Sequence, residues 1–180
     1  PAEAAELALH LANRRDAARL TAQQAENLAG LCGRLPLAIE IAANTLAVAS
    51  GWNADDFLTA LAKGTETLDM LKGAEGSLKA TLAVSLETLD GEALERWQAL
   101  AVFDGGFDAA AAGALWQMEN PQPALAGLET RSLLTFDEEA DRYHLHDLLR
   151  ALALERLSSG AAHESTARHR HAAIYFSVLE

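Results

Sequence analysis

Three residues whose side chains can do chemistry lie close together near the carboxyl end of the chain: His144, His146 and Asp147. Two imidazoles and a carboxylate are possible ligands of a metal ion. A hydrolytic metal centre would need further His or Asp ligands that converge on one point, and none are evident in the sequence. From spacing alone, His146 is a loop histidine and Asp147 is the cap of a following helix, where it accepts backbone N–H bonds. We therefore predict no metal ligand and no catalytic residue here.

A second informative stretch, Leu31–Glu40, places a glycine and a proline between two apolar helical patterns. Gly33 is typical of the residue that ends a helix. Pro36 fits the first turn of the next helix, where its missing N–H costs nothing. Spacing alone thus makes Pro36 a helix-start proline.

The chain lacks the residues that hold nucleotide phosphates in P-loop ATPases. No Gly-Lys dipeptide occurs, so the G-x-x-x-x-G-K-[ST] loop is absent. No apolar strand ends in an acidic pair that would hold Mg²⁺ in the usual way. We therefore expect that the chain by itself is not an enzyme and neither binds nor hydrolyses ATP.

The composition restricts the possible partners. The formal net charge is −12 and the acidic residues are spread along the chain, so duplex DNA would repel such a surface. No apolar run approaches the roughly 18–20 residues of a membrane span. Cys32 is the only cysteine, and its helical spacing from apolar residues suits a buried position in a reducing cytoplasm. We expect a cytoplasmic protein with no direct nucleic-acid or membrane contact, whose two ends are cut from a longer chain.

The first part of the sequence predicts a helical bundle. Abundant alanine and few β-branched residues favour helix throughout. Apolar positions repeat at helical spacing over residues 3–13, and again after Thr21, which opens a capping box. A third helix begins at Pro36, and Asn53 can cap a fourth. We predict a four-helix, lid-like bundle over residues 1–72.

The second part predicts a winged-helix domain. Lys72–Gly76 is the best boundary, because it has two glycines and no apolar pattern. Amphipathic helices follow, and then the period changes to the alternation of strands in Ser132–Phe136 and Arg142–Leu145. Three helices, a hairpin and a closing helix are the order expected of a winged-helix domain, which we assign to residues 73–160.

Two of these helices have an aspartate in capping position, at Asp90 and Asp108. After the closing helix, residues 161–180 begin another amphipathic helix. Its apolar face has no evident partner within the chain, so it is expected to start a helical repeat. That face consists of Ala172, Tyr175, Phe176 and Leu179.

Both motif stretches resemble those of a known family. Leu31–Glu40 and Arg142–Arg150 are similar, in order and distance, to the "GLPLA" and "MHD" motifs of the STAND signalling ATPases, and of the NB-ARC group in particular. Four further segments resemble bacterial members of the group: Ala101–Phe107, Leu125–Leu134, Ala151–Leu157 and Arg168–Leu179. The resemblance therefore covers nearly the whole chain.

This resemblance implies a role in reading a nucleotide. Pro36 would contact the adenine ring, and His146 would reach toward the β-phosphate of ADP bound to an upstream P-loop domain, which holds ADP or ATP with Mg²⁺. Imidazole suits this role because it is compact, donates a hydrogen bond and changes charge near neutrality. Two residues depart from the family pattern: Arg34 stands at the usual glycine, and Leu145 stands at the usual methionine.

The fragment is then expected to couple the nucleotide state of the upstream domain to autoinhibition and oligomerisation, with tetratricopeptide-like repeats following it. One alternative is a winged-helix module that binds protein or DNA. A third interpretation, based on His144, His146 and Asp147, is an all-helical metal-dependent phosphohydrolase.

Overall fold

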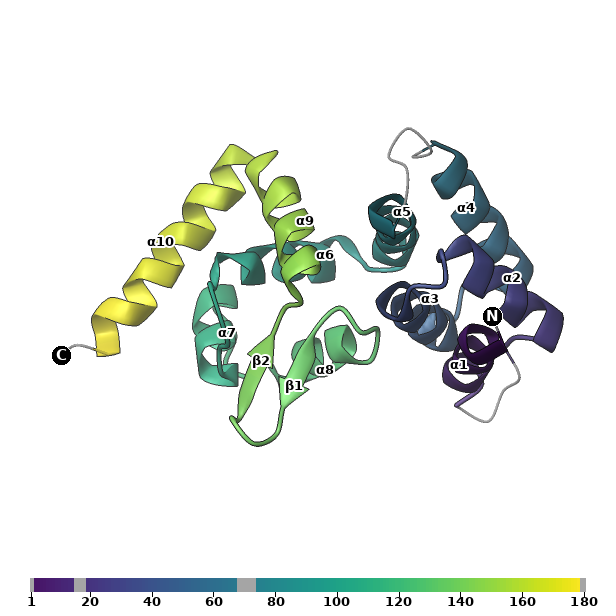
Figure 1. The fold of residues 1–180 in the computed structure, drawn as a ribbon. Helices are drawn as coiled ribbons and strands as arrows, with labels where there is room; N and C mark the ends of the chain where they lie inside the picture. Colours follow the sequence, from purple (N-terminus) through teal and green to yellow (C-terminus); the bar gives the residue numbers. More distant parts are fainter. Residues whose placement is uncertain (1, 15–18, 68–73, 179–180) are drawn as a thin grey trace. The chain divides into compact units, whose positions relative to one another are not determined.

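The computed structural model describes residues 2–14, 19–67 and 74–178. In this part the fold is mainly helical, with one two-stranded antiparallel hairpin, as the sequence predicts (Figure 1). The elements, in chain order, are α1 (Ala2–Ala12), α2 (Ala22–Leu31), α3 (Pro36–Val48), α4 (Ala54–Thr67), α5 (Ala74–Glu87), α6 (Gly91–Ala99), the 3₁₀ turn η1 (Leu100–Val102), α7 (Ala109–Trp116), α8 (Gln122–Glu129), β1 (Thr135–Asp137), β2 (Arg142–His144), α9 (Asp147–Ser158) and α10 (Ala161–Val178).

Packing divides the chain into two units. The first consists of Pro1–Leu89 with Thr130–Ser132, and the second consists of Asp90–Glu129 with Leu133–Glu180. The domain boundary drawn from the sequence, between residues 72 and 73, lies outside the described residues. The helix that follows it, α5, packs against α3 and α4, so it groups with the first unit.

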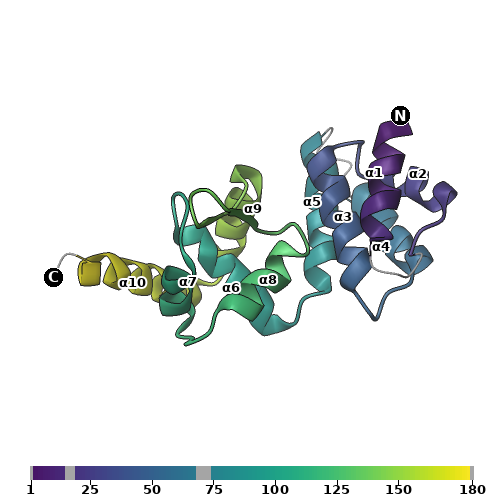
Figure 2. The same ribbon diagram turned by 90° about the horizontal axis from the view of Figure 1, so that it is seen from below.

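In the first unit, α3 is the central helix. It lies between α1 and α5 in both views (Figures 1 and 2), and the backbone contacts agree. Ile39 and Leu46 of α3 and Phe57 of α4 are fully buried. The capping box at Thr21 has both of its hydrogen bonds, and Asn53 Oδ1 accepts from the Asp56 N–H at 2.8 Å. Both predicted caps are therefore confirmed.

In the second unit, α6, α7 and α9 surround a core that contains Trp97 and Leu115. The aspartate caps are confirmed, because Asp90 accepts from the Ala93 N–H and Asp108 from the Ala111 N–H, each at 2.7 Å. These side chains satisfy N–H groups that would otherwise have no partner at the helix starts.

The last helix, α10, lies alongside α7 and α9 (Figure 1). Ala167 is buried in this contact, and the ring of His171 meets that of Phe103 edge-on at 5.0 Å. The face of α10 that packs is not the apolar face named from the sequence. On that apolar face Ala172 is exposed and Phe176 is 70% exposed, whereas the Tyr175 side chain and Leu179 lie outside the described part. The helix packs on one face and leaves Ala172 and Phe176 in solvent.

The hairpin pairs Thr135 with His144 and Asp137 with Arg142. The first strand is shorter than the predicted Ser132–Phe136 because its first residues bond elsewhere. The Leu133 N–H donates to the Leu128 carbonyl at 3.0 Å, and the Leu133 carbonyl accepts from the Trp97 indole N–H at 3.2 Å. Neither group of Leu133 is left for a strand ladder.

Candidate functional site

The side chain of His146 caps helix α9. His146 is the residue before the helix, and its Nδ1 accepts the backbone N–H of Leu148 at 3.3 Å. The sequence assigned this role to Asp147, which instead is the first residue of the helix. Asp147 is exposed there, at the end of the helix dipole that favours negative charge. The prediction of the capping residue was therefore wrong by one position.

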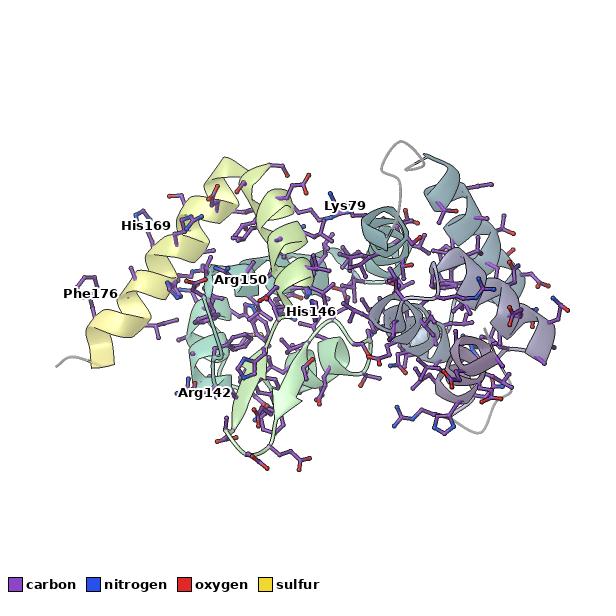
Figure 3. All side chains as sticks on the ribbon, viewed as in Figure 1. Lys79, Arg142, His146, Arg150, His169 and Phe176 are labelled. Atoms are coloured by element: carbon purple, nitrogen blue, oxygen red, sulfur yellow. The ribbon has the colours of Figure 1, made fainter. Side chains whose placement is uncertain are left out.

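This hydrogen bond sets the tautomer of His146. Because Nδ1 accepts, the proton of the neutral ring is on Nε2. The residue is exposed, and it lies where the hairpin meets α9 (Figure 3). His146 thus combines a capping hydrogen bond at Nδ1 with an exposed N–H donor at Nε2.

The hairpin is held next to His146 by residues that follow the η1 turn. Phe107 and Tyr143 form an isolated antiparallel bridge, with N–H to carbonyl distances of 3.0 and 2.7 Å in the two directions. The rings of Phe103 and Phe107 stack at 4.6 Å, and the Phe107 ring stacks on that of Tyr143 at 6.1 Å. These contacts position β2 and therefore the connection that carries His146.

Gly106 makes room for the ring of His144. A Cβ atom at this glycine would lie 2.5 Å from His144 Cε1 and 3.0 Å from Nε2. The half-buried His144 therefore packs on backbone, whereas His146 is exposed two residues later. Among the residues that the structure describes, no group of three or more His, Cys, Asp or Glu side chains is arranged to hold a metal ion.

Arg150, one turn into α9, is a site residue that the sequence reasoning missed (Figure 3). Its Nε donates to the carbonyls of Phe103 and Ala101, at 2.8 and 3.2 Å. Its Nη2 forms an ion pair with Asp104 at 2.9 Å. The signal available in the sequence was an arginine in the first turn of the helix that follows the His-Asp pair.

A small cavity of about 130 Å³ lies beneath these contacts. Pockets that hold drug-sized ligands measure roughly 300–1,000 Å³, so this cavity does not enclose a nucleotide. Leu100, Phe103, Asp104, Gly105, Phe107, His144, Leu145, Asp147 and Arg150 line it. His146 does not line this cavity and is exposed to solvent.

The other predicted site residue, Pro36, lies in the first unit. It is exposed at the first position of α3, one residue beyond the Gly33-Arg34 pair, whose φ angles of 63° and 57° are both left-handed. Arg34 Nη2 pairs with Glu26 Oε1 at 3.3 Å. Pro36 and His146 belong to different units, so a nucleotide-facing cleft that both residues share stays a prediction.

Two other titratable residues are structural. Burial raises the pKa of Cys32 to about 12, with a smaller opposing effect from its hydrogen bond to Thr81. The buried thiol position predicted from the sequence is thus confirmed. Burial also lowers the pKa of His171, and the charge of Arg168 lowers it further. His171 is therefore held in its neutral form against the Phe103 ring.

No family model matches the chain. Two proteins named Regulatory protein AfsR are similar: that of Streptomyces coelicolor is 32% identical over 134 residues, and that of Streptomyces griseus is 33% identical over 134 residues. The chain is a homologue of bacterial regulatory proteins.

Each alignment covers 73% of this chain but only 13% and 14% of the two regulators. The chain therefore spans a small part of the length of these relatives. Among the described residues, no helix has both the length and the apolar character needed to cross a membrane.

Proposed function

We propose that this chain is the regulatory segment of a cytoplasmic STAND signalling ATPase of the NB-ARC type. In this proposal an upstream P-loop domain of the same polypeptide holds ADP or ATP with Mg²⁺. The chain senses which nucleotide is bound and couples that state to autoinhibition and oligomerisation through downstream repeats. The motif resemblance and the likeness to the two regulators support this proposal.

The observation that carries the proposal is the geometry of His146. Its Nδ1 is occupied by the Leu148 N–H, so the neutral ring presents an Nε2–H donor at an exposed helix start. A phosphate oxygen is a strong acceptor for such a donor, and the positive end of the helix dipole favours an anion at the same place. Each property is what a contact to a nucleotide phosphate requires.

The charge of the winged-helix elements favours a protein partner over DNA. Helix α8 carries no lysine or arginine, and the hairpin turn is acidic, with Asp137, Glu138, Glu139 and Asp141. Phosphate contacts from cations supply most non-specific DNA affinity. The DNA-binding alternative thus has no support from these two elements.

The direct test measures ADP release from the longer protein that includes the P-loop domain. His146→Ala should release bound ADP roughly 5–150-fold faster, a coupling of about 1–3 kcal/mol, and should raise basal signalling. His146→Asn is the sharper variant, because Asn still caps the helix but lacks the ring. His169→Ala, which removes another exposed histidine, is the matched control (Figure 3). Unchanged ADP release and oligomerisation in both His146 variants would exclude the assigned role.

The isolated chain provides a second test. Calorimetric titration with ADP and ATP should show no saturable binding below roughly millimolar concentrations, about −4 kcal/mol, because the phosphate-binding loop is absent. Submicromolar binding to this chain alone would contradict the proposal that an upstream domain holds the nucleotide.

A further inference from the structure

We propose that Arg150 is the positioning residue for His146. It ties the first turn of α9 to the carbonyl of Ala101 in η1 and to that of Phe103 directly after η1, and so fixes the direction in which the imidazole Nε2–H points. The consequence of this positioning for ADP rests on the proposed function above, whereas the positioning itself can be measured without nucleotide.

The first step of the argument is the link between the two residues. The backbone N–H of Arg150 donates to the carbonyl of His146 at 2.9 Å, which closes the first helical turn behind the histidine. The ring of His146 is fixed to the same turn through the Leu148 N–H. Any movement of this turn therefore moves the imidazole.

The second step is what holds the turn in place. The Arg150 guanidinium reaches the carbonyls of Ala101 and Phe103 and the carboxylate of Asp104. Ala101 and Phe103 are buried in the core of the second unit, where Phe103 stacks on Phe107. The helix start is thereby attached to a rigid part of the fold rather than to a surface loop.

The third step is why the residue is arginine. A planar guanidinium donates in several fixed directions, whereas a lysine ammonium is a compact point charge. The Asp104 side chain is 90% exposed, and exposed ion pairs contribute little. The Nε–H, which is shared between the two carbonyls, therefore carries most of the positioning, so replacing Arg150 should matter much more than replacing Asp104.

The first experiment uses nitrogen NMR of the His146 ring in this chain, at a pH above about 8, where imidazole is neutral. The wild type should show the Nε2–H tautomer, together with a slowly exchanging Arg150 Nε–H. Arg150→Lys should shift the ring resonances of His146 from their wild-type positions, Asp104→Asn should leave them nearly unchanged, and Arg156→Lys, an exposed arginine of the same helix, should have no effect. Arg150→Gln replaces the lysine variant if that variant does not fold.

Two results of this experiment would overturn the proposal. One is a wild-type Arg150 Nε–H that exchanges as fast as that of exposed Arg156. The other is a folded Arg150 variant in which the ring shifts of His146 are unchanged. A merely structural arginine would lower stability without moving those ring shifts.

The second experiment is a double-mutant cycle on ADP release from the longer protein. If Arg150 acts through His146, Arg150→Lys accelerates release, and the double variant with His146→Ala releases ADP no faster than His146→Ala alone. Fully additive effects would overturn the positioning role. If His146→Ala has no effect by itself, the proposed function fails, whereas the NMR result still decides the proposal on Arg150.

Discussion

The loop before α3 and the connection before α9 both bring a sequence motif to the start of a helix, but they hold it by different means. In the first, two consecutive left-handed residues, Gly33 and Arg34, turn the chain toward Pro36. The residue in capping position there, Leu35, makes no side-chain hydrogen bond. The shape of this loop therefore depends mostly on the backbone conformation of its own residues.

The connection before α9 depends on contacts with residues far away in the sequence. The Phe107–Tyr143 bridge and the packing of His144 on Gly106 hold β2, and Arg150 holds the helix. Of the two predicted site residues, His146 is therefore the one whose segment is held by long-range contacts. Substitutions should accordingly affect the two regions to different extents.

The largest effect is expected for Gly106→Ala. The new Cβ would lie 2.5 Å from the His144 ring, so either the ring or β2 must shift. Overpacking of this kind costs about 1–3 kcal/mol in the free energy of unfolding, which urea denaturation measures. The neighbour Gly105 has open space around its Cβ position, so Gly105→Ala is the matched control and should be nearly neutral. Equal effects for the two glycines would mean that the packing of His144 does not hold the hairpin.

Gly33→Ala tests the loop before α3 and should lower the free energy of unfolding by about 1 kcal/mol. Its φ of 63° is left-handed, and an added Cβ would lie 2.9 Å from Ser77 Oγ. The Ser77 hydroxyl is the cause of part of this cost, so Gly33→Ala should cost less in a Ser77→Ala background than in the wild type. Denaturation curves of the single and double variants give the comparison, and a stabilising Gly33→Ala would contradict the assigned backbone conformation.

His146→Ala should reduce the stability of this chain by about 0.5–1 kcal/mol, because the Leu148 N–H loses its acceptor. His146→Asn should keep most of that stability, since asparagine is a strong capping residue. This pair of variants separates the contribution of the capping hydrogen bond to stability from that of the imidazole ring. If alanine and asparagine were equally stable, the hydrogen bond from Leu148 would contribute nothing in solution.

The helices and most of their caps could be predicted from the sequence because their signals are local. Thr21 and Asp90 bond to backbone groups three residues away, and Pro36 needs only its own fixed φ to begin a helix. The hairpin was predictable from its alternation, although the Trp97 indole takes a carbonyl that the pattern assigned to the strand. No local pattern indicates that distant contact.

The candidate site was predictable to a smaller extent. The sequence indicated His146, but it named Asp147 as the cap, because a histidine is an uncommon capping residue. Arg150 was missed because its acceptors lie 47 and 49 residues earlier in the chain. The segment that contains those acceptors, Ala101–Phe107, was noted in the sequence for its resemblance to the family. Only the fold shows that α9 is attached to it.

The smallest effect is expected for Arg34→Gly, and its sign is opposite to that of Gly33→Ala. Arg34 has a φ of 57°, which costs a non-glycine residue about 1–2 kcal/mol. Glycine removes this strain, but it adds about 0.4–1 kcal/mol of unfolded-chain entropy and loses the exposed ion pair with Glu26. The net gain in the free energy of unfolding should be about 0.5 kcal/mol.

Arg34→Ala is the control for this last comparison. It loses the ion pair but keeps the left-handed strain, so it should show no gain, and the difference between alanine and glycine isolates the backbone contribution. The midpoint of urea denaturation for the two variants measures that difference. If alanine were as stable as glycine, Arg34 would not be strained, and the loop before α3 would then be held by its contacts, as the start of α9 is.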